Sequence, residues 1–212
     1  MGQAGLLELN TIPERYQKDA LNDGYFAKLR NEYKYLAHKF NLTPMDYRQW
    51  RFLRLRPQNF PHIRISQLAH LYYQRKAGLS QLVEAASVED AKKVLATAVT
   101  PYWETHYTFG STSVRNDKNL SPFSLNLLCI NTVVPILFAY GRHRGEEKYC
   151  DRAFDFLEQL RPENNYIIRL WQQCGLVVDN AGDSQALIQL KKEYCDKKEC
   201  LRCRFGYEYL KL

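Results

Sequence analysis

The sequence lacks the motifs that would assign it a reaction. It contains no phosphate-binding glycine loop, no His-Glu-x-x-His helix and no Gly-x-Ser-x-Gly turn. Paired carboxylates followed by lysine in a strand context are missing as well. These absences argue against the common phosphate-transfer, zinc-protease and serine-hydrolase classes. The chain alone is therefore expected not to be an enzyme, and a thiol enzyme that uses Cys203 is the weakest function class.

A secretory signal is also missing. The opening residues MGQAGLLELN have neither a basic region nor a long apolar run. The longest apolar run, from Phe123 to Tyr140, is interrupted by Asn126, Asn131 and Pro135, which would be costly in lipid. We expect a buried core helix there. The sequence thus predicts a cytoplasmic protein without a membrane partner, in a compartment that keeps thiols reduced.

The chain is rich in apolar residues and has more basic than acidic residues. Of its 212 residues 45% are hydrophobic and 13% are aromatic, which suffices for a sizeable core. The formal net charge is +7 and the pI is about 9.0. A positive surface field at neutral pH favours anionic partners without naming one.

Apolar residues recur at helical spacing through most of the sequence, and period-two alternation is nearly absent. This pattern predicts an all-α protein: a single compact multi-helix domain, residues 1–212, with a short cysteine-rich C-terminal tail. A subdivision near residues 110–120 is the alternative, because that segment is polar and resembles a loop. The oligomeric state stays open.

Turn and capping residues set the expected helix boundaries. The predicted helices are a region from Pro13 to Phe40 broken near Asn22-Asp23-Gly24, Ile63 to Gly78, Ser87 to Tyr107 with a kink at Pro101, Ser121 to Gly141, Glu146 to Leu160, Pro162 to Gly175, and Asp183 to Tyr194. Around Glu104 and His106 we expect a helix end. There Trp103, Tyr107 and Phe109 enter the core while the polar groups find local partners.

Three of the six cysteines lie within nine residues near the C-terminus. Cys195, Cys200 and Cys203 have the spacing Cys-x4-Cys-x2-Cys, and the last two form a pair that can grip one metal ion. Zinc requires a fourth ligand, for which Cys174 is the nearest upstream candidate. An iron–sulfur cluster is a second interpretation. Thiols without any metal are the third, because cysteine is among the most often buried residues.

A second cluster is rich in arginine and aromatic residues. The string RQWRFLRLRPQNFPHIR holds five arginines within 17 residues. Guanidinium groups bind phosphates in bidentate fashion and aromatic rings stack on unpaired bases, so this composition favours nucleic-acid contact. The residues predicted to make it are Arg48, Arg51, Arg54, Arg56, Arg64 and Trp50.

Two details of this cluster follow from local patterning. Arg48 and Arg51, and with them Arg54, are expected to share one face of a short helix that ends before the two prolines of the string. The alternative gives Arg56, Asn59 and Arg64 a structural role, in which they donate hydrogen bonds to backbone carbonyls of a loop that no helix or strand pairing satisfies.

Six strings of the sequence stand out together: GQAGLL, RLRPQNFPHIRISQLA, YWETHYTFG, PENNYIIRLW, DSQALIQL and YCDKKECLRC. In combination they resemble an uncharacterised bacterial family, domain of unknown function 2851, over essentially the whole chain. The resemblance implies the C-terminal half of longer proteins whose N-terminal half is similar to a restriction-endonuclease-like α/β fold. It also implies that Cys195, Cys200 and Cys203 correspond to cysteines typical of the family.

These observations predict a cytoplasmic bacterial domain that is the non-catalytic, nucleic-acid-binding partner of a nuclease-like N-terminal domain, with zinc at its cysteine tail. The alternative is a structural or protein-interaction domain whose positive charge serves only solvation. Nucleic-acid affinity that falls with salt, and on replacement of Arg48 or Arg51, would separate the two.

Overall fold

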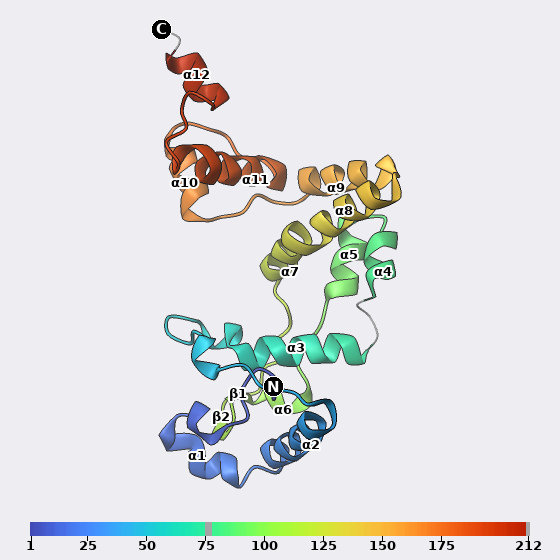
Figure 1. Ribbon diagram of the computed structural model, residues 1–212, viewed down its shortest axis with the longest axis vertical. Coiled ribbons are helices and arrows are strands. Elements are labelled where there is room, and N and C mark those ends of the chain that lie inside the picture. Colours follow the sequence, from blue (N-terminus) through green and yellow to red (C-terminus); the bar gives the residue numbers. More distant parts are fainter. Residues whose placement is uncertain (75–77, 211–212) are drawn as a thin grey trace. The chain divides into compact units, whose positions relative to one another are not determined.

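The computed structural model describes residues 1–74 and 78–210 (Figure 1). Helices dominate this part of the chain, and its sheet consists of two short antiparallel strands, so the predicted all-α class is confirmed. The chain divides into two compact units, residues 1–76 with 96–120 and residues 77–95 with 121–212. Whether the protein is one domain or is subdivided near residues 110–120 stays a prediction.

The first unit holds the N-terminal helices and the hairpin. Its elements are the 3-10 turns η1 (Leu9–Thr11), η2 (Tyr47–Gln49) and η3 (Pro57–Asn59), the helices α1 (Glu14–Leu21), α2 (Gly24–Phe40), α3 (Pro61–Tyr73) and α6 (Pro101–Glu104), and the strands β1 (His106–Thr108) and β2 (Ser111–Thr112). The predicted break near Asn22 is confirmed. There the Asp23 carboxylate accepts the N–H groups of Tyr25 (2.8 Å) and Phe26 (3.4 Å) and caps α2.

Aromatic residues fill the core of this unit. Trp103 is 1% exposed and Phe109 is fully buried, so the expectation that they enter the core is confirmed. Their rings pack edge to face with centroids 5.0 Å apart, and Phe26 from α2 lies against Phe109. Gly110 turns the hairpin at a φ of 70°, where a Cβ would lie 2.4 Å from the carbonyl oxygen of Tyr16.

The predicted long helix from Ser87 to Tyr107 is wrong. Ser87 does act as a cap, because its Oγ accepts the N–H of Asp90 at 3.1 Å. The helix ends at Leu95, however, which is the last residue of this stretch in the second unit, and the next five residues belong to the first unit. Three of the five are β-branched, and the following Pro101 has no N–H, so the segment favours extended backbone over helix.

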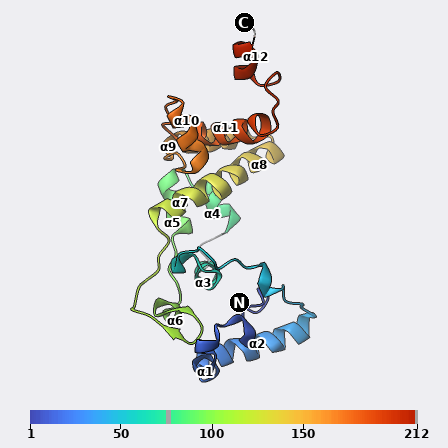
Figure 2. The same ribbon diagram turned by 90° about the vertical axis from the view of Figure 1, so that its left-hand side faces the viewer.

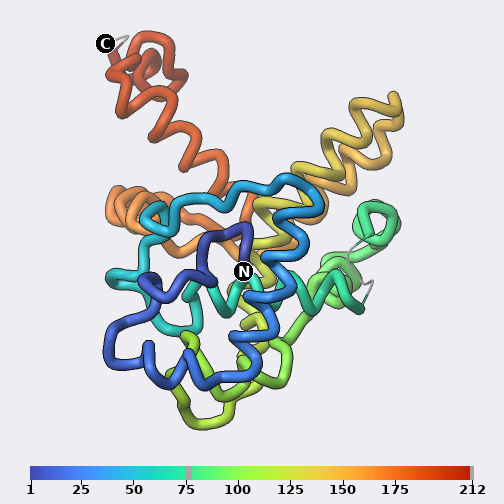
Figure 3. The backbone as a smooth tube through the Cα atoms, turned by 60° about the horizontal axis from the view of Figure 1, so that its bottom comes forward, coloured from blue at the N-terminus to red at the C-terminus, as the bar shows by residue number. Residues whose placement is uncertain are grey.

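The second unit consists of helices. They are α4 (Leu79–Glu84), α5 (Val88–Leu95), α7 (Pro122–Leu128), α8 (Val134–Arg144), α9 (Glu147–Gln159), α10 (Tyr166–Gln173), α11 (Ala181–Leu190) and α12 (Arg204–Leu210), with π-helical turns η4 (Cys129–Val133) and η5 (Lys191–Cys195). The pair α8 and α9 run side by side (Figure 3). Gly141 allows this close approach, because a Cβ there would lie 2.8 Å from Cys150 Sγ.

The long apolar run forms α7, η4 and α8 in continuous succession. Cys129, Val133 and Leu137 are fully buried in the core of the second unit, so the expected core helix is confirmed for one face. Phe123 (57% exposed) and Phe138 (41%) lie outside that core. By length and composition alone the stretch Pro122–Arg144 could cross a membrane, but core helices of soluble proteins pass the same test.

Candidate functional site

The arginine-rich segment lies between α2 and α3 and is anchored on the N-terminal residues (Figure 2). Met45 N–H donates to the Gln3 carbonyl at 3.0 Å, and the Gln3 side-chain amide donates to the Thr43 carbonyl. Trp50 Nε1 donates to the Ala4 carbonyl at 2.8 Å. We call residues 48–56 the arginine loop.

A tight turn forms the tip of the arginine loop. Leu55 N–H donates to the Phe52 carbonyl at 3.1 Å, and Arg54 has a φ of 65°. Leu53, at the first central position of the turn, is 85% exposed. Phe52 holds the base of the turn, because its ring packs edge to face on Phe60 with centroids 5.3 Å apart. The base is therefore fixed while the tip faces solvent.

The predicted helical face that carries Arg48, Arg51 and Arg54 is wrong. Arg48 lies in η2, which Asp46 caps and which ends at Gln49. Trp50 and Phe52 are two residues apart, and both are anchored within the first unit. Extended backbone places such residues on the same side, whereas a helix would place them on opposite sides.

Four arginines of the loop are exposed and form no ion pair in the described part of the chain: Arg48, Arg51, Arg54 and Arg56. No hydrogen bond from these four guanidinium groups occurs among the described residues either. Their charges are thus available to an anion outside the chain. Among the described residues, no contact of the Arg56 side chain supports its alternative structural role.

Arg64 differs from the other predicted arginines. Its Nη1 donates to Gln67 Oε1 at 2.8 Å and its Nη2 donates to Asn59 Oδ1 at 2.6 Å. Partial burial lowers the pKa of its guanidinium. Arg64 and Asn59 therefore hold the start of α3 in place, a structural role that the alternative expected for both, although the acceptors in these two bonds are side-chain oxygens and not backbone carbonyls.

Trp50 and Phe52 of the arginine loop contact other residues of the first unit. The indole N–H of Trp50 is used by the Ala4 carbonyl, and Phe52 packs on Phe60 and against the ring of His62. These rings are half-buried. The arginines rather than the aromatic residues of the loop face solvent.

The positive charge of the protein belongs to the first unit. That unit contains 15 Lys and Arg against 8 Asp and Glu, whereas the second contains 15 against 15. The first unit therefore carries the whole formal charge of +7. From Tyr47 to Val83 the sequence has no acidic residue, so the arginine loop lies in the most basic part of the chain.

The C-terminal cysteines do not form a ligand cluster in the structure. Cys174, Cys195 and Cys200 are exposed and Cys203 is buried. Partial desolvation of the Cys195 thiol, and next the nearby Cys203 thiol, raise the pKa of Cys195. Among the described residues, no group of three or more His, Cys, Asp or Glu side chains could hold a metal ion. Zinc or an iron–sulfur cluster at these cysteines stays a prediction.

The polar residues of the hairpin region are satisfied locally, as expected. Arg115 Nε pairs with the Glu104 carboxylate at 2.8 Å, and His106 Nδ1 lies 2.8 Å from the Tyr102 carbonyl. The Tyr102 hydroxyl donates to the Asp23 carboxylate, and burial followed by this hydrogen bond raises the pKa of Tyr102. Asp23 thus both caps α2 and joins it to α6, so this constellation has a structural explanation.

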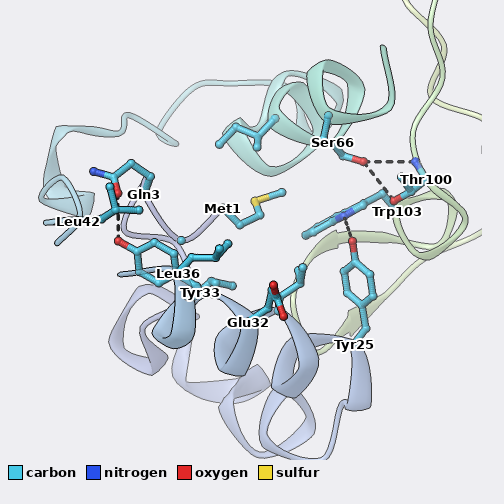
Figure 4. A pocket seen from close by; sticks show the side chains of 15 residues that line it. Met1, Gln3, Tyr25, Glu32, Tyr33, Leu36, Leu42, Ser66, Thr100 and Trp103 are labelled. Atoms are coloured by element: carbon cyan, nitrogen blue, oxygen red, sulfur yellow. Dashed lines mark hydrogen bonds between the residues drawn. The ribbon is translucent and has the colours of Figure 1, made fainter. Parts of the chain in front are cut away.

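A pocket of about 370 Å³ lies in the first unit between the N-terminal residues, α2 and α3 (Figure 4). Its walls are mostly apolar. Trp103 Nε1 donates to the Tyr25 hydroxyl at 3.3 Å, and Tyr33 OH donates to Gln3 Oε1 at 3.2 Å. Of the described residues that line it, Glu32 provides the charged side chain. One carboxylate in an apolar pocket does not specify a ligand class.

Comparison with known proteins identifies a family. A family model described as "Protein of unknown function (DUF2851)" matches residues 1–166, which include the whole arginine loop and end before Cys174. Neither the search of curated proteins nor the search of solved structures gives a match. The matched range does not bear on the predicted correspondence of the C-terminal cysteines.

Proposed function

We propose that this chain, which belongs to the DUF2851 family of proteins of unknown function, binds nucleic acid through its arginine loop. The observation that carries the proposal is the exposure of four arginines, Arg48, Arg51, Arg54 and Arg56, without an ion pair among the described residues. Like charges so close in sequence repel one another, and a row of phosphates would neutralise them.

The charge distribution supports the same proposal. The loop belongs to the unit that carries the entire excess of basic residues. Such a field accelerates association with a polyanion before any contact forms. In this proposal the chain is the non-catalytic half of a longer bacterial protein, next to a nuclease-like N-terminal domain.

A matched pair of triple variants tests the proposal. One variant replaces Arg48, Arg51 and Arg56 with Ala, and the control replaces Arg142, Arg161 and Lys192 with Ala. The control residues are exposed cations of the second unit and belong to none of the ion pairs in the described residues. Both variants lose the same net charge, so a difference between them reports the loop itself.

Fluorescence anisotropy with a labelled DNA duplex gives the Kd of each variant. We expect the loop variant to bind at least about tenfold more weakly, because three phosphate contacts are lost, and the control to bind nearly as the parent chain does. Equal weakening of both variants, or unchanged binding of the loop variant, would overturn the proposal. The latter result would favour the structural or protein-interaction alternative.

A further inference from the structure

Leu53 is the most exposed large apolar side chain of the arginine loop, and its position is unusual. Its exposed fraction is 85%, against 40% for Leu55. Isolated apolar residues are common on protein surfaces and need no explanation by themselves. Leu53, however, lies at the apex of a hydrogen-bonded turn, with the exposed Arg54 directly after it and the exposed Arg51 two residues before it.

The turn that presents Leu53 is well supported. Phe52, immediately before it, packs on Phe60 and against the buried ring of His62. Trp50 is tied to the N-terminal residues by its hydrogen bond to the Ala4 carbonyl. A side chain on such a packed base is held in one position. A side chain that inserts between stacked bases needs this support, because the bases resist being separated.

Arg54 adds a second indication. It holds a φ of 65° at the second central position of the turn, where glycine or asparagine is the usual residue. An arginine in this conformation keeps a cation beside the tip at the expense of backbone strain.

The aromatic side chains of the loop point to duplex over single-stranded ligands. Proteins that hold single strands stack exposed aromatic rings on the bases. Here Trp50 and Phe52 of the loop are half-buried and are engaged with other parts of the first unit, Phe52 with Phe60. Minor-groove proteins instead combine arginine with an apolar wedge, often leucine, that enters a base step.

We infer that the arginine loop binds double-stranded DNA and that Leu53 is the wedge that enters between adjacent base pairs. This inference rests on the proposed function, because the flanking arginines must hold the phosphates on both sides of the step. The ligand class is duplex DNA with a deformable base step. Single-stranded DNA has no base-pair step for the side chain to open.

Two leucines of one turn provide the test and its control. Leu53→Ala removes the proposed wedge, and Leu55→Ala removes the same number of atoms two residues away. The probe is a DNA duplex in which 2-aminopurine replaces one adenine, because its fluorescence rises when stacking is disturbed. Anisotropy of the same duplex, and of its labelled single strand, gives both affinities.

The full chain should raise 2-aminopurine fluorescence on binding the duplex. Leu53→Ala should abolish this rise and weaken duplex binding about tenfold, since most of the buried leucine side chain is lost. Its affinity for the single strand should stay unchanged. Leu55→Ala should behave as the parent chain, and Leu53→Met should retain the signal because methionine can also act as a wedge.

The arginine triple variant distinguishes a failure of the proposed DNA binding from a failure of the Leu53 wedge. If it binds DNA as the parent chain does, the proposed function fails and the wedge fails with it. If it binds weakly while Leu53→Ala matches the parent chain in fluorescence and duplex affinity, the wedge alone is wrong. Tighter binding of the parent chain to the single strand than to the duplex would also overturn the wedge.

Discussion

Arg54 has a backbone conformation that conflicts with its chemical type, as do Lys118 and Lys198, which also have a positive φ. The Arg54 φ of 65° places a residue with a Cβ in the left-handed region, at a cost of roughly 1–2 kcal/mol compared with an ordinary conformation. Glycine would remove that cost and would in turn lose some entropy on folding. A substitution at Arg54 should therefore change the free energy of unfolding and the affinity for DNA in opposite directions.

We predict that Arg54→Gly raises the free energy of unfolding by about 0.5–1 kcal/mol while it weakens DNA binding. The matched control is Arg56→Gly, because Arg56 has a φ of −66° and gains nothing from glycine. Urea unfolding followed by tryptophan fluorescence measures the first effect. A destabilised Arg54→Gly chain would contradict the strained turn.

His62 is a second residue with an unusual environment. Its side chain is buried between Phe52, Trp103 and Phe109, and its Nδ1 has no hydrogen-bond partner. Burial, and then the positive N-terminal amine, lower its pKa to about 4. The folded protein therefore holds this ring neutral, while the unfolded chain protonates it near pH 6.5.

The sign of the pH dependence follows from this difference. Because the folded pKa lies below the unfolded one, the His62 contribution to stability is complete above pH 6.5 and is lost as the pH falls toward 4. The loss amounts to about 3 kcal/mol. In His62→Phe, the decrease in unfolding free energy between pH 7 and pH 4 should be smaller by about this amount. An identical pH dependence in both proteins would contradict the buried neutral histidine.

Among the structural elements, the hairpin depends on one lysine from the loop that follows it. Lys118 is 3% exposed, and its Nζ donates to the carbonyls of Trp103, Glu104 (3.0 Å) and His106 (3.0 Å). The same ammonium lies 4.0 Å from the centroid of the Tyr107 ring. A single cation thus satisfies the backbone groups where α6 ends and β1 begins.

We predict that Lys118→Met lowers the free energy of unfolding by about 2–4 kcal/mol, because the three carbonyls lose their shared donor. Lys93→Met provides the control. Lys93 is 77% exposed and pairs with Asp90 on the surface of α5, so its loss should cost about 0.5 kcal/mol or less. Comparable losses in the two variants would contradict the structural role of Lys118.

Elements built from local patterns could be predicted from the sequence, and those built from distant contacts could not. The break at Asn22 and the cap at Ser87 depend on neighbours two or three residues apart. The shape of the arginine loop depends on Trp50 reaching Ala4, 46 residues earlier in the chain. Spacing rules contain no information about such a contact, so they favoured a helix there.

The candidate site could be predicted from composition only in part. The arginine-rich string identified the segment that we propose as the site, but composition could not tell which of its side chains are exposed and unpaired in the described part of the chain. Arg64 is bonded to Asn59 and Gln67, and Trp50 is used as an anchor, while Arg48 and Arg51 face solvent. The exposed Leu53 at the turn apex had no signal in the sequence, because its role depends on the turn.

For the whole molecule, charge is divided unevenly between two units of similar size. The first carries the full +7 and the second is neutral. Net charge by itself favours solubility and nonspecific association. Only the number of ions released on binding shows whether discrete arginine–phosphate contacts form, because each such contact displaces condensed counterions.

The salt dependence of duplex binding is accordingly the most direct measurement. A plot of log Kobs against log salt concentration should have a slope of about −3.6 for four arginine–phosphate contacts on B-form DNA. The slope should become shallower, about −0.9, when Arg48, Arg51 and Arg56 are replaced by Ala. It should stay near −3.6 in the second-unit control. A slope near zero in the parent chain, or one that the loop substitutions leave unchanged, would contradict the account.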